Sequence, residues 1–166
     1  MTRLNVCIFV PFWHARGTAR MAIVRMGLLY LAAVSLREDH MPRQIITTAN
    51  APSSPLYSQG VKAGPHVLVS GIVGIDPNTG GLAGNTIQDQ ARQAMTNGQA
   101  ILQAGGAGLE DVIEVGILLS NPGDFAGLNE EYARWFPAEP PTRYVAKLGV
   151  ELPGLLVSIR MTAFTN

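Results

Sequence analysis

The sequence predicts an α+β domain in which two helices pack on one face of a mixed or largely antiparallel sheet. Short β-prone runs alternate with two longer stretches whose apolar residues recur every three or four positions, in the order β-β-β-α-β-α-β-β. Strands mixed with two helices in this way are typical of sheets that carry their helices on one side. The hydrophobic fraction of 47% and the charged fraction of 14% fit a protein that buries a substantial core.

Three strands are expected in the first half of the domain. Residues 44–47 form a short β-prone run that ends in polar residues. Residues 61–64 and 66–70 flank the Gly64-Pro65 turn, so they suggest a hairpin. The segment 76–81, with the sequence Asp-Pro-Asn-Thr-Gly-Gly, is a strong turn signal that separates these strands from the first helix.

Both helices have recognisable start and stop signals. Thr86 stands where an N-cap belongs, and the helix after it is expected to run for about 17 residues with one apolar face. Gly105-Gly106 supplies its stop. Asp124 can cap the second helix, which extends to about Phe136 and ends at the prolines that follow.

Three more strands complete the order. Residues 111–119, between the two helices, are rich in β-branched and other apolar residues. Strands at about residues 143–148 and 155–164 close the chain. The sequence contains no internal repeat and no low-complexity segment, so a single domain at residues 41–166 is expected.

Charge is distributed unevenly between the domain and the residues before it. Residues 1–40 hold five arginines and two acidic residues, whereas residues 41–166 hold seven Lys and Arg against ten Asp and Glu, a net charge of −3. Nucleic-acid binding requires several cations close together, and an acidic domain with dispersed cations is poorly suited to it. We therefore expect no DNA partner, and RNA is disfavoured as well.

Cysteine and histidine are scarce. The only cysteine, Cys7, precedes the domain, so no intramolecular disulfide can form, which suits a reducing cytoplasm. The three histidines are far apart and have no cysteine at ligand spacing. We expect no metal site and a cytoplasmic location.

Residues 1–40 are interpreted as an N-terminal extension or leader outside the fold. Their apolar run, residues 26–36, is 11 residues long, whereas a membrane-spanning helix needs about 20. No small-x-small cleavage site follows the run. A presequence or a weakly membrane-associating helix stays open, but stable membrane association is not expected.

Six different short motifs follow one another along residues 43–164. They are Ala51-Pro52 with Tyr57-Ser58-Gln59-Gly60, Ser70-Gly71 with Asp76–Gly80, Gln90-Ala91-Arg92-Gln93 with Asn97, Gly108–Val112, Asp124-Phe125 with Asn129–Tyr132, and Pro141-Thr142-Arg143 with Leu152-Pro153-Gly154. Each motif is weak alone, but their order and spacing resemble the RidA/YjgF/UK114 family of small proteins that handle reactive imines and enamines. Residues 1–40 take no part in the resemblance.

This resemblance implies a chorismate-mutase-like α+β protomer that assembles as a homotrimer, with ligand clefts between subunits. It also implies hydrolysis of 2-imino or enamine acids, such as 2-iminobutanoate and 2-iminopropanoate, to 2-keto acids and ammonia. No metal or organic cofactor is implied, and the expected partner is a small-molecule carboxylate.

Arg143 is the first candidate for the chemistry. A guanidinium is permanently charged, and its planar fork matches a carboxylate bidentately. A 2-imino acid carries such a carboxylate beside its electrophilic carbon, so a clamp there would orient the C=N bond for attack. In the family that the chain resembles, the arginine of the matching Pro-x-Arg motif holds the ligand carboxylate. The alternative is a structural arginine at the start of a strand.

Four further residues match substrate-binding positions of that family. Tyr57 matches an aromatic residue at the cleft entrance, but an ordinary core aromatic is equally consistent with the sequence. Asn129 matches an asparagine near the cleft, and its amide could instead satisfy backbone groups of its helix. Ser70 and Gly71 match a segment whose backbone approaches the ligand, although Gly71 could also mark a β-bulge.

The chain departs from the family's pattern on its last strand, where an apolar-Glu-apolar-Glu run is expected and Val157-Ser158-Ile159-Arg160 is found. Ser158 takes the place of the acid that positions the attacking water. A hydroxyl can hold a water but is no general base at neutral pH. Besides the hydrolase, the sequence therefore leaves open a non-catalytic trimer that binds small carboxylates, and, less favoured, an endoribonuclease or translation inhibitor.

Overall fold

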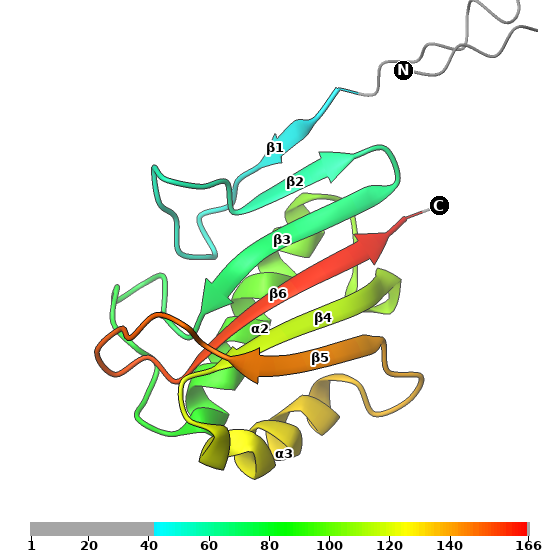
Figure 1. The fold of residues 1–166 in the computed structure, drawn as a ribbon. Coiled ribbons are helices and arrows are strands. Elements are labelled where there is room, and N and C mark those ends of the chain that lie inside the picture. Colours follow the sequence, from blue (N-terminus) through cyan, green and yellow to red (C-terminus); the bar gives the residue numbers. More distant parts are fainter. Residues whose placement is uncertain (1–41, 166) are drawn as a thin grey trace, which may run out of the picture. The chain divides into compact units, whose positions relative to one another are not determined.

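Residues 42–165 are the part of the chain that the computed structural model describes, and they form one six-stranded sheet with two α-helices (Figure 1). The expected order of strands and helices is confirmed. The predicted leader at residues 1–40 lies outside the described residues, and its separation from the domain stays a prediction. Within the described part, no helix is both long and apolar enough to cross a membrane.

The sheet is mixed, as predicted. Its strands are β1 (Gln44–Ile46), β2 (Gly60–Ala63), β3 (His66–Val73), β4 (Val112–Leu119), β5 (Thr142–Lys147) and β6 (Val157–Phe164). Their spatial order is β1-β2-β3-β6-β4-β5. Only the β4–β5 pair is parallel, and every other pair in the sheet is antiparallel. The last strand of the chain therefore lies in the middle of the sheet, and β5 forms one edge.

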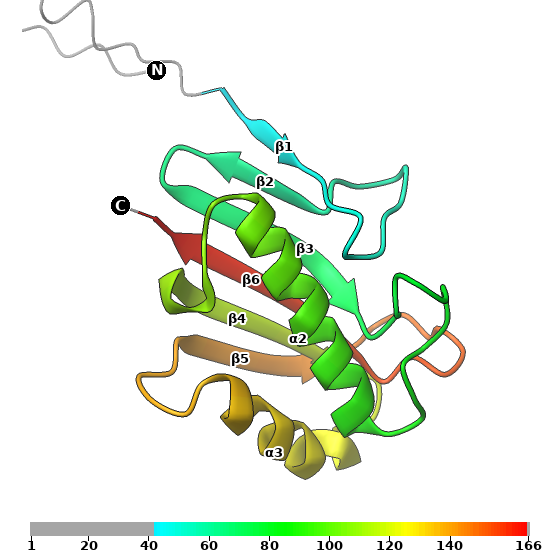
Figure 2. The same cartoon turned by 180° about the vertical axis from the view of Figure 1, so that it is seen from behind.

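Both helices lie on the same side of the sheet (Figure 2). Helix α2 (Ile87–Ala104) packs across β3 and β6, and α3 (Phe125–Trp135) packs beside α2. Short 3₁₀ turns at Leu109–Asp111 and Pro122–Asp124 lead into β4 and α3. The core between helices and sheet is built from fully buried aliphatic side chains, among them Val67, Ile101, Leu102, Val115, Ile117 and Val157.

The helix starts differ in how they are capped. Thr86 is the N-cap of α2, as predicted, and its side chain accepts a hydrogen bond from the backbone N–H of Asp89. Asp124 precedes α3 as predicted, but its side chain makes no capping bond. Its backbone is already helical because the 3₁₀ turn runs straight into α3. The side chain of Asn121 caps the turn instead, and its Oδ1 accepts a hydrogen bond from Gly123 N–H at 3.0 Å.

Strand β3 extends past its predicted end at Ser70. The pairing of β3 with β6 shifts register between Val69 and Ile72, so Ser70 and Gly71 form an irregularity inside the strand. A bulge of this kind bends a strand and increases its twist without ending it. The predicted possibility that Gly71 marks a bulge is therefore confirmed.

The face of the sheet away from the helices is open in the described chain. Side chains alternate along a strand, so Ser158, Arg160 and Thr162 of β6 point away from the buried Ile159 and Met161. The open face carries the exposed apolar side chains Leu68, Tyr144 and Phe164. An added side chain at Gly116 would collide with the Tyr144 ring, so the glycine lets this ring lie across the sheet.

Candidate functional site

Arg143, the second residue of edge strand β5, lies against helix α3. Its Nη1 donates to Asn129 Oδ1 at 2.9 Å, which brings together two of the predicted site residues. The guanidinium carbon lies 4.6 Å from the ring centroid of Tyr132 and 5.9 Å from that of Phe125. These distances are typical of cation–π contacts, which hold the side chain in place without using its N–H donors.

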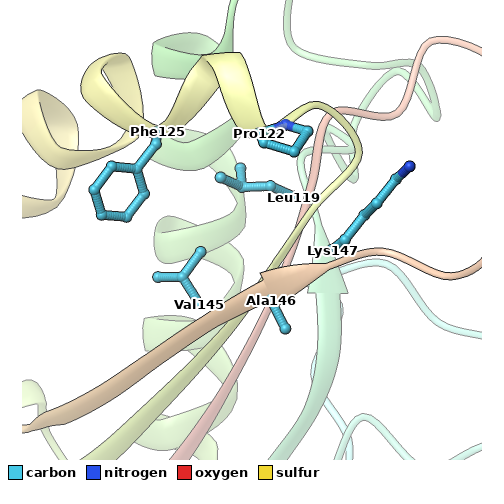
Figure 3. A pocket seen from close by; sticks show the side chains of 6 residues that line it. All are labelled: Leu119, Pro122, Phe125, Val145, Ala146 and Lys147. Carbon is cyan, nitrogen blue, oxygen red and sulfur yellow. The ribbon is translucent and has the colours of Figure 1, made fainter.

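Two crevices lie near this arginine, which lines the first and contacts Phe125 of the second. One, of about 340 Å³, is lined by Asn129, Tyr132, Ala133, Phe136, Pro140, Pro141 and Arg143 itself. The other, of about 330 Å³, is lined by Leu119, Pro122, Phe125, Val145, Ala146 and Lys147 (Figure 3). Because the bond to Asn129 uses one of five guanidinium N–H groups, donors remain for an anion.

Tyr132 forms the floor beneath the guanidinium. Its side chain is 8% exposed, and its hydroxyl has no hydrogen-bond partner among the described residues. Burial raises the pKa of the Tyr132 phenol, and the positive charge of Arg143 only partly opposes that shift. The phenol is therefore neutral at physiological pH, and its ring presents an uncharged face to the cation.

Helix α3 is fixed to α2 by a buried carboxylate. Glu131 is 2% exposed and accepts hydrogen bonds from Arg92 Nη2 at 2.9 Å and Arg92 Nε at 3.2 Å. Since Glu131 lies between Asn129 and Tyr132 in the sequence, this ion pair holds the segment of α3 that contacts Arg143.

Ser158, Ser70 and Gly71 gather on another part of the sheet. A side chain added at Gly71 would come within 2.9 Å of Ser158 Oγ, so the glycine leaves the serine hydroxyl room beside the bulge. Ser70 Oγ donates to the backbone carbonyl of Ser58 at 2.6 Å. This bond ties the bulge to the loop that carries Tyr57.

Tyr57 is 48% exposed and lies in that loop, so it is not the core aromatic that the sequence left open. It lines a crevice of about 460 Å³ formed mainly by the loops on either side of it. The buried Gln59 amide pins these loops because its Nε2 donates to the carbonyls of Thr48, Ala51 and Pro52.

The two groups of predicted residues do not meet within one protomer. Arg143 pairs with the buried Val115, which places it on the helix side of the sheet, whereas Ser158 points to the open face. Tyr57 is separated from Arg143 by the strands between β2 and β5, about 19 Å at the usual inter-strand spacing of about 4.8 Å. Within one chain, the predicted site residues therefore form two separate groups.

Sequence reasoning missed three residues beside Arg143. Phe125 and Tyr132 entered the sequence analysis only as parts of a family motif, without a role at the site, and Lys147 was not singled out. The signal for Lys147 is the period of two along β5, which places Arg143, Val145 and Lys147 on one face. In residues 42–165, no three His, Cys, Asp or Glu side chains are grouped in a way that could hold a metal ion.

Known proteins match the domain over nearly its whole length. Residues 48–165 match the family model described as endoribonuclease L-PSP. A RutC family protein from Pyrococcus horikoshii is 39% identical over 124 residues, which cover 74% of this chain and 98% of the relative. The 2-iminobutanoate/2-iminopropanoate deaminase of Homo sapiens is 32% identical over 122 residues, covering 73% of this chain and 89% of that protein.

A solved structure agrees with the fold. Escherichia coli TdcF, crystallised with bound serine, has a TM-score of 0.69 and 32% sequence identity, covering 74% of this chain and 99% of that one. These matches point to the same family as the motifs along residues 43–164, and the order of strands and helices is consistent with it. The chain belongs to the endoribonuclease L-PSP family, the RidA/YjgF/UK114 family that its motifs resemble.

Proposed function

We propose that this protein hydrolyses reactive 2-imino or enamine acids to 2-keto acids and ammonia, with the substrate carboxylate bound by Arg143. The observation that supports this most directly is the placement of Arg143: a cation that is oriented by Asn129, rests on two aromatic rings and keeps donors for an anion beside an apolar crevice. Relatives named as imine deaminases, and TdcF with bound serine, are consistent with a small carboxylate ligand.

The reaction is a simple hydrolysis. Binding of the carboxylate by the guanidinium fork fixes the position of the adjacent C=N carbon. A water oxygen attacks this carbon, the nitrogen takes up protons, and the C–N bond breaks to leave the 2-keto acid and ammonia. The electrophilic carbon is reactive by itself, so the main contribution of the site is to orient substrate and water.

Ser158 is the proposed holder of that water. Its hydroxyl has both a donor and acceptors, and Gly71 keeps space next to it. Because Ser158 and Arg143 occupy opposite faces of one sheet, the proposal requires that each cleft combine Arg143 of one chain with Ser158 and Tyr57 of a neighbour. A homotrimer with clefts between its subunits is the assembly that we propose.

The decisive experiment measures the decay of 2-iminobutanoate and 2-iminopropanoate, generated in situ by an amino-acid oxidase. Wild type should accelerate the decay, and Arg143→Ala should lower kcat/KM by about 10- to 100-fold through loss of a charge-assisted clamp. Arg143→Lys should fall between them because it keeps the charge and loses the fork. Arg43→Met, which removes an exposed cation before β1, is the matched control. No acceleration by wild type across several imines would refute the proposal.

A binding protein without turnover is the second candidate, and Ser158 is the observation that favours it. In that case calorimetry should show 2-oxobutanoate binding that is lost in Arg143→Ala, with no imine hydrolysis by wild type. A strong gain of turnover in Ser158→Glu would show that the cleft lacks only an acid. Ribonuclease action is disfavoured by the net charge of −3 over residues 41–166.

A further inference from the structure

The crevice next to Arg143 has a second cation at its far end. Arg143, Val145 and Lys147 alternate along β5 and pair with Val115, Ile117 and Leu119 of β4, all of which are buried on the helix side. The three β5 side chains therefore share one face of the sheet. Four residues of extended strand place the Cα atoms of Arg143 and Lys147 about 13 Å apart.

The space between these cations is apolar. We call it the β5 trough, defined by its lining residues Leu119, Pro122, Phe125, Val145, Ala146 and Lys147. Phe125, Leu119 and Val145 face a common space, and Lys147 stands on the side away from Phe125 (Figure 3). Phe125 also lies under the Arg143 guanidinium, so the trough begins at the proposed carboxylate clamp.

Within the described part of the chain, neither cation is neutralised by a carboxylate. Over residues 42–165, the ion pairs involve Arg92, Arg134 and Arg160, but not Arg143 or Lys147. Two unpaired cations on one strand face, separated by an apolar floor, are complementary to a ligand with an anion at each end.

We propose that the β5 trough selects 2-imino acids whose side chain ends in a second carboxylate, such as the imines of aspartate and glutamate. The inference rests on the proposed role of Arg143 and extends it. Arg143 binds the carboxylate next to the imine, Phe125 and Val145 cover the methylene chain, and Lys147 binds the distal carboxylate. The flexible four-carbon stem of lysine can adjust to side chains of different length.

Binding tests this proposal without requiring turnover. Calorimetry on the full-length protein should show that 2-oxoglutarate binds about tenfold more tightly than 2-oxobutanoate, as expected for one additional charge-assisted hydrogen bond. Lys147→Met should abolish this preference, and Lys147→Arg should keep most of it. Arg43→Met, which removes one positive charge far from the trough, should leave the preference intact. Equal binding of the two keto acids by wild type, or a preference that survives Lys147→Met, would overturn the proposal.

Turnover separates this inference from the proposed function. The ratio of kcat/KM for the imine of glutamate to that for 2-iminobutanoate should be about tenfold lower in Lys147→Met than in wild type. Hydrolysis of 2-iminobutanoate without any preference for the dicarboxylic imine would refute the proposed selectivity of the trough but would support the proposed hydrolase function. Preferential binding of 2-oxoglutarate without hydrolysis of any imine would refute the proposed hydrolase and support the proposed role of the trough.

Discussion

Removing the carboxylate of the Glu131 ion pairs and removing one of their arginines should lower the stability of the fold by different amounts. The Glu131 carboxylate is 2% exposed and accepts from Arg92 at 2.9 and 3.2 Å, from Arg134 at 3.3 Å and from Trp135 Nε1 at 3.2 Å. The side chains of Arg92 and Arg134 are 46% and 68% exposed. The anion is thus buried while both cations reach solvent, so losing a cation differs from losing the anion.

Arg92→Met removes the two-point partner of a carboxylate that cannot regain water. Breaking a fully buried pair in this way costs about 3–5 kcal/mol, and we expect about 2–3 kcal/mol here because Arg92 is half exposed. Glu131→Gln keeps the volume and one acceptor, so it should cost about 1–2 kcal/mol. Arg134→Met removes a single long bond from an exposed cation and should cost less than about 1 kcal/mol.

Urea unfolding of the three variants checks the order. The midpoint should fall most for Arg92→Met, with an unchanged m-value if the variants unfold between the same two states. The pair also raises the pKa of Arg92, chiefly through its hydrogen bond to Glu131, so the arginine stays charged throughout the pH range of such a measurement. An Arg92→Met variant no less stable than Arg134→Met would show that Glu131 is solvated in the folded protein and would refute the reasoning.

Two further predictions concern the stability of the fold. Tyr132→Phe removes a buried hydroxyl that has no partner among the described residues, and urea unfolding should show a gain of about 1 kcal/mol. Burial also raises the pKa of this phenol, so the unfolded chain ionises first and the stability of wild type should fall above about pH 10, a loss that Tyr132→Phe should lessen. A less stable Phe variant would reveal a hidden partner. Gly74→Ala would place a methyl group 2.6 Å from the Gln90 backbone, where α2 crosses β3, and should cost at least about 2 kcal/mol by thermal or urea unfolding. Gly149→Ala, whose added carbon meets nothing within 4 Å, is its control, and equal costs for the two would contradict the close approach.

Local signals predicted the elements because each signal acts within a few residues. Thr86 as an N-cap, the glycine stop of α2 and the hairpin around Gly64-Pro65 all follow from short-range chemistry. Asp124 shows the limit of this reasoning. A side chain of the right type stands at the right place, but the preceding 3₁₀ turn gives its backbone a helical conformation, so its side chain makes no capping bond.

These local signals could not predict the order of the strands in the sheet, because that order depends on pairing between distant segments. Strand β6 ends the chain yet lies between β3 and β4, and the parallel pairing of β5 with β4 depends on the crossover through α3. The contact between Arg143 and Asn129 depends on that crossover. Resemblance to a family identified both residues. The position of Lys147 in the trough became visible only from the pairing register of β5, and that of Phe125 beside Arg143 only from the packing of α3.

Because side chains alternate between the two faces of a sheet, Arg143 and Ser158 of one protomer cannot act in the same cleft. Arg143 and Ser158 are fixed to opposite faces, and no side-chain rotation can bring them into one cleft within a protomer. The open face also leaves Leu68, Tyr144 and Phe164 about two-fifths exposed, which is apolar area that a neighbouring chain could bury. If hydrolysis needs both residues, a protomer kept apart from its copies would retain the Arg143 clamp and lose the Ser158 water. Carboxylate binding would then persist where turnover fails, because the cation and its Asn129 partner belong to the same chain.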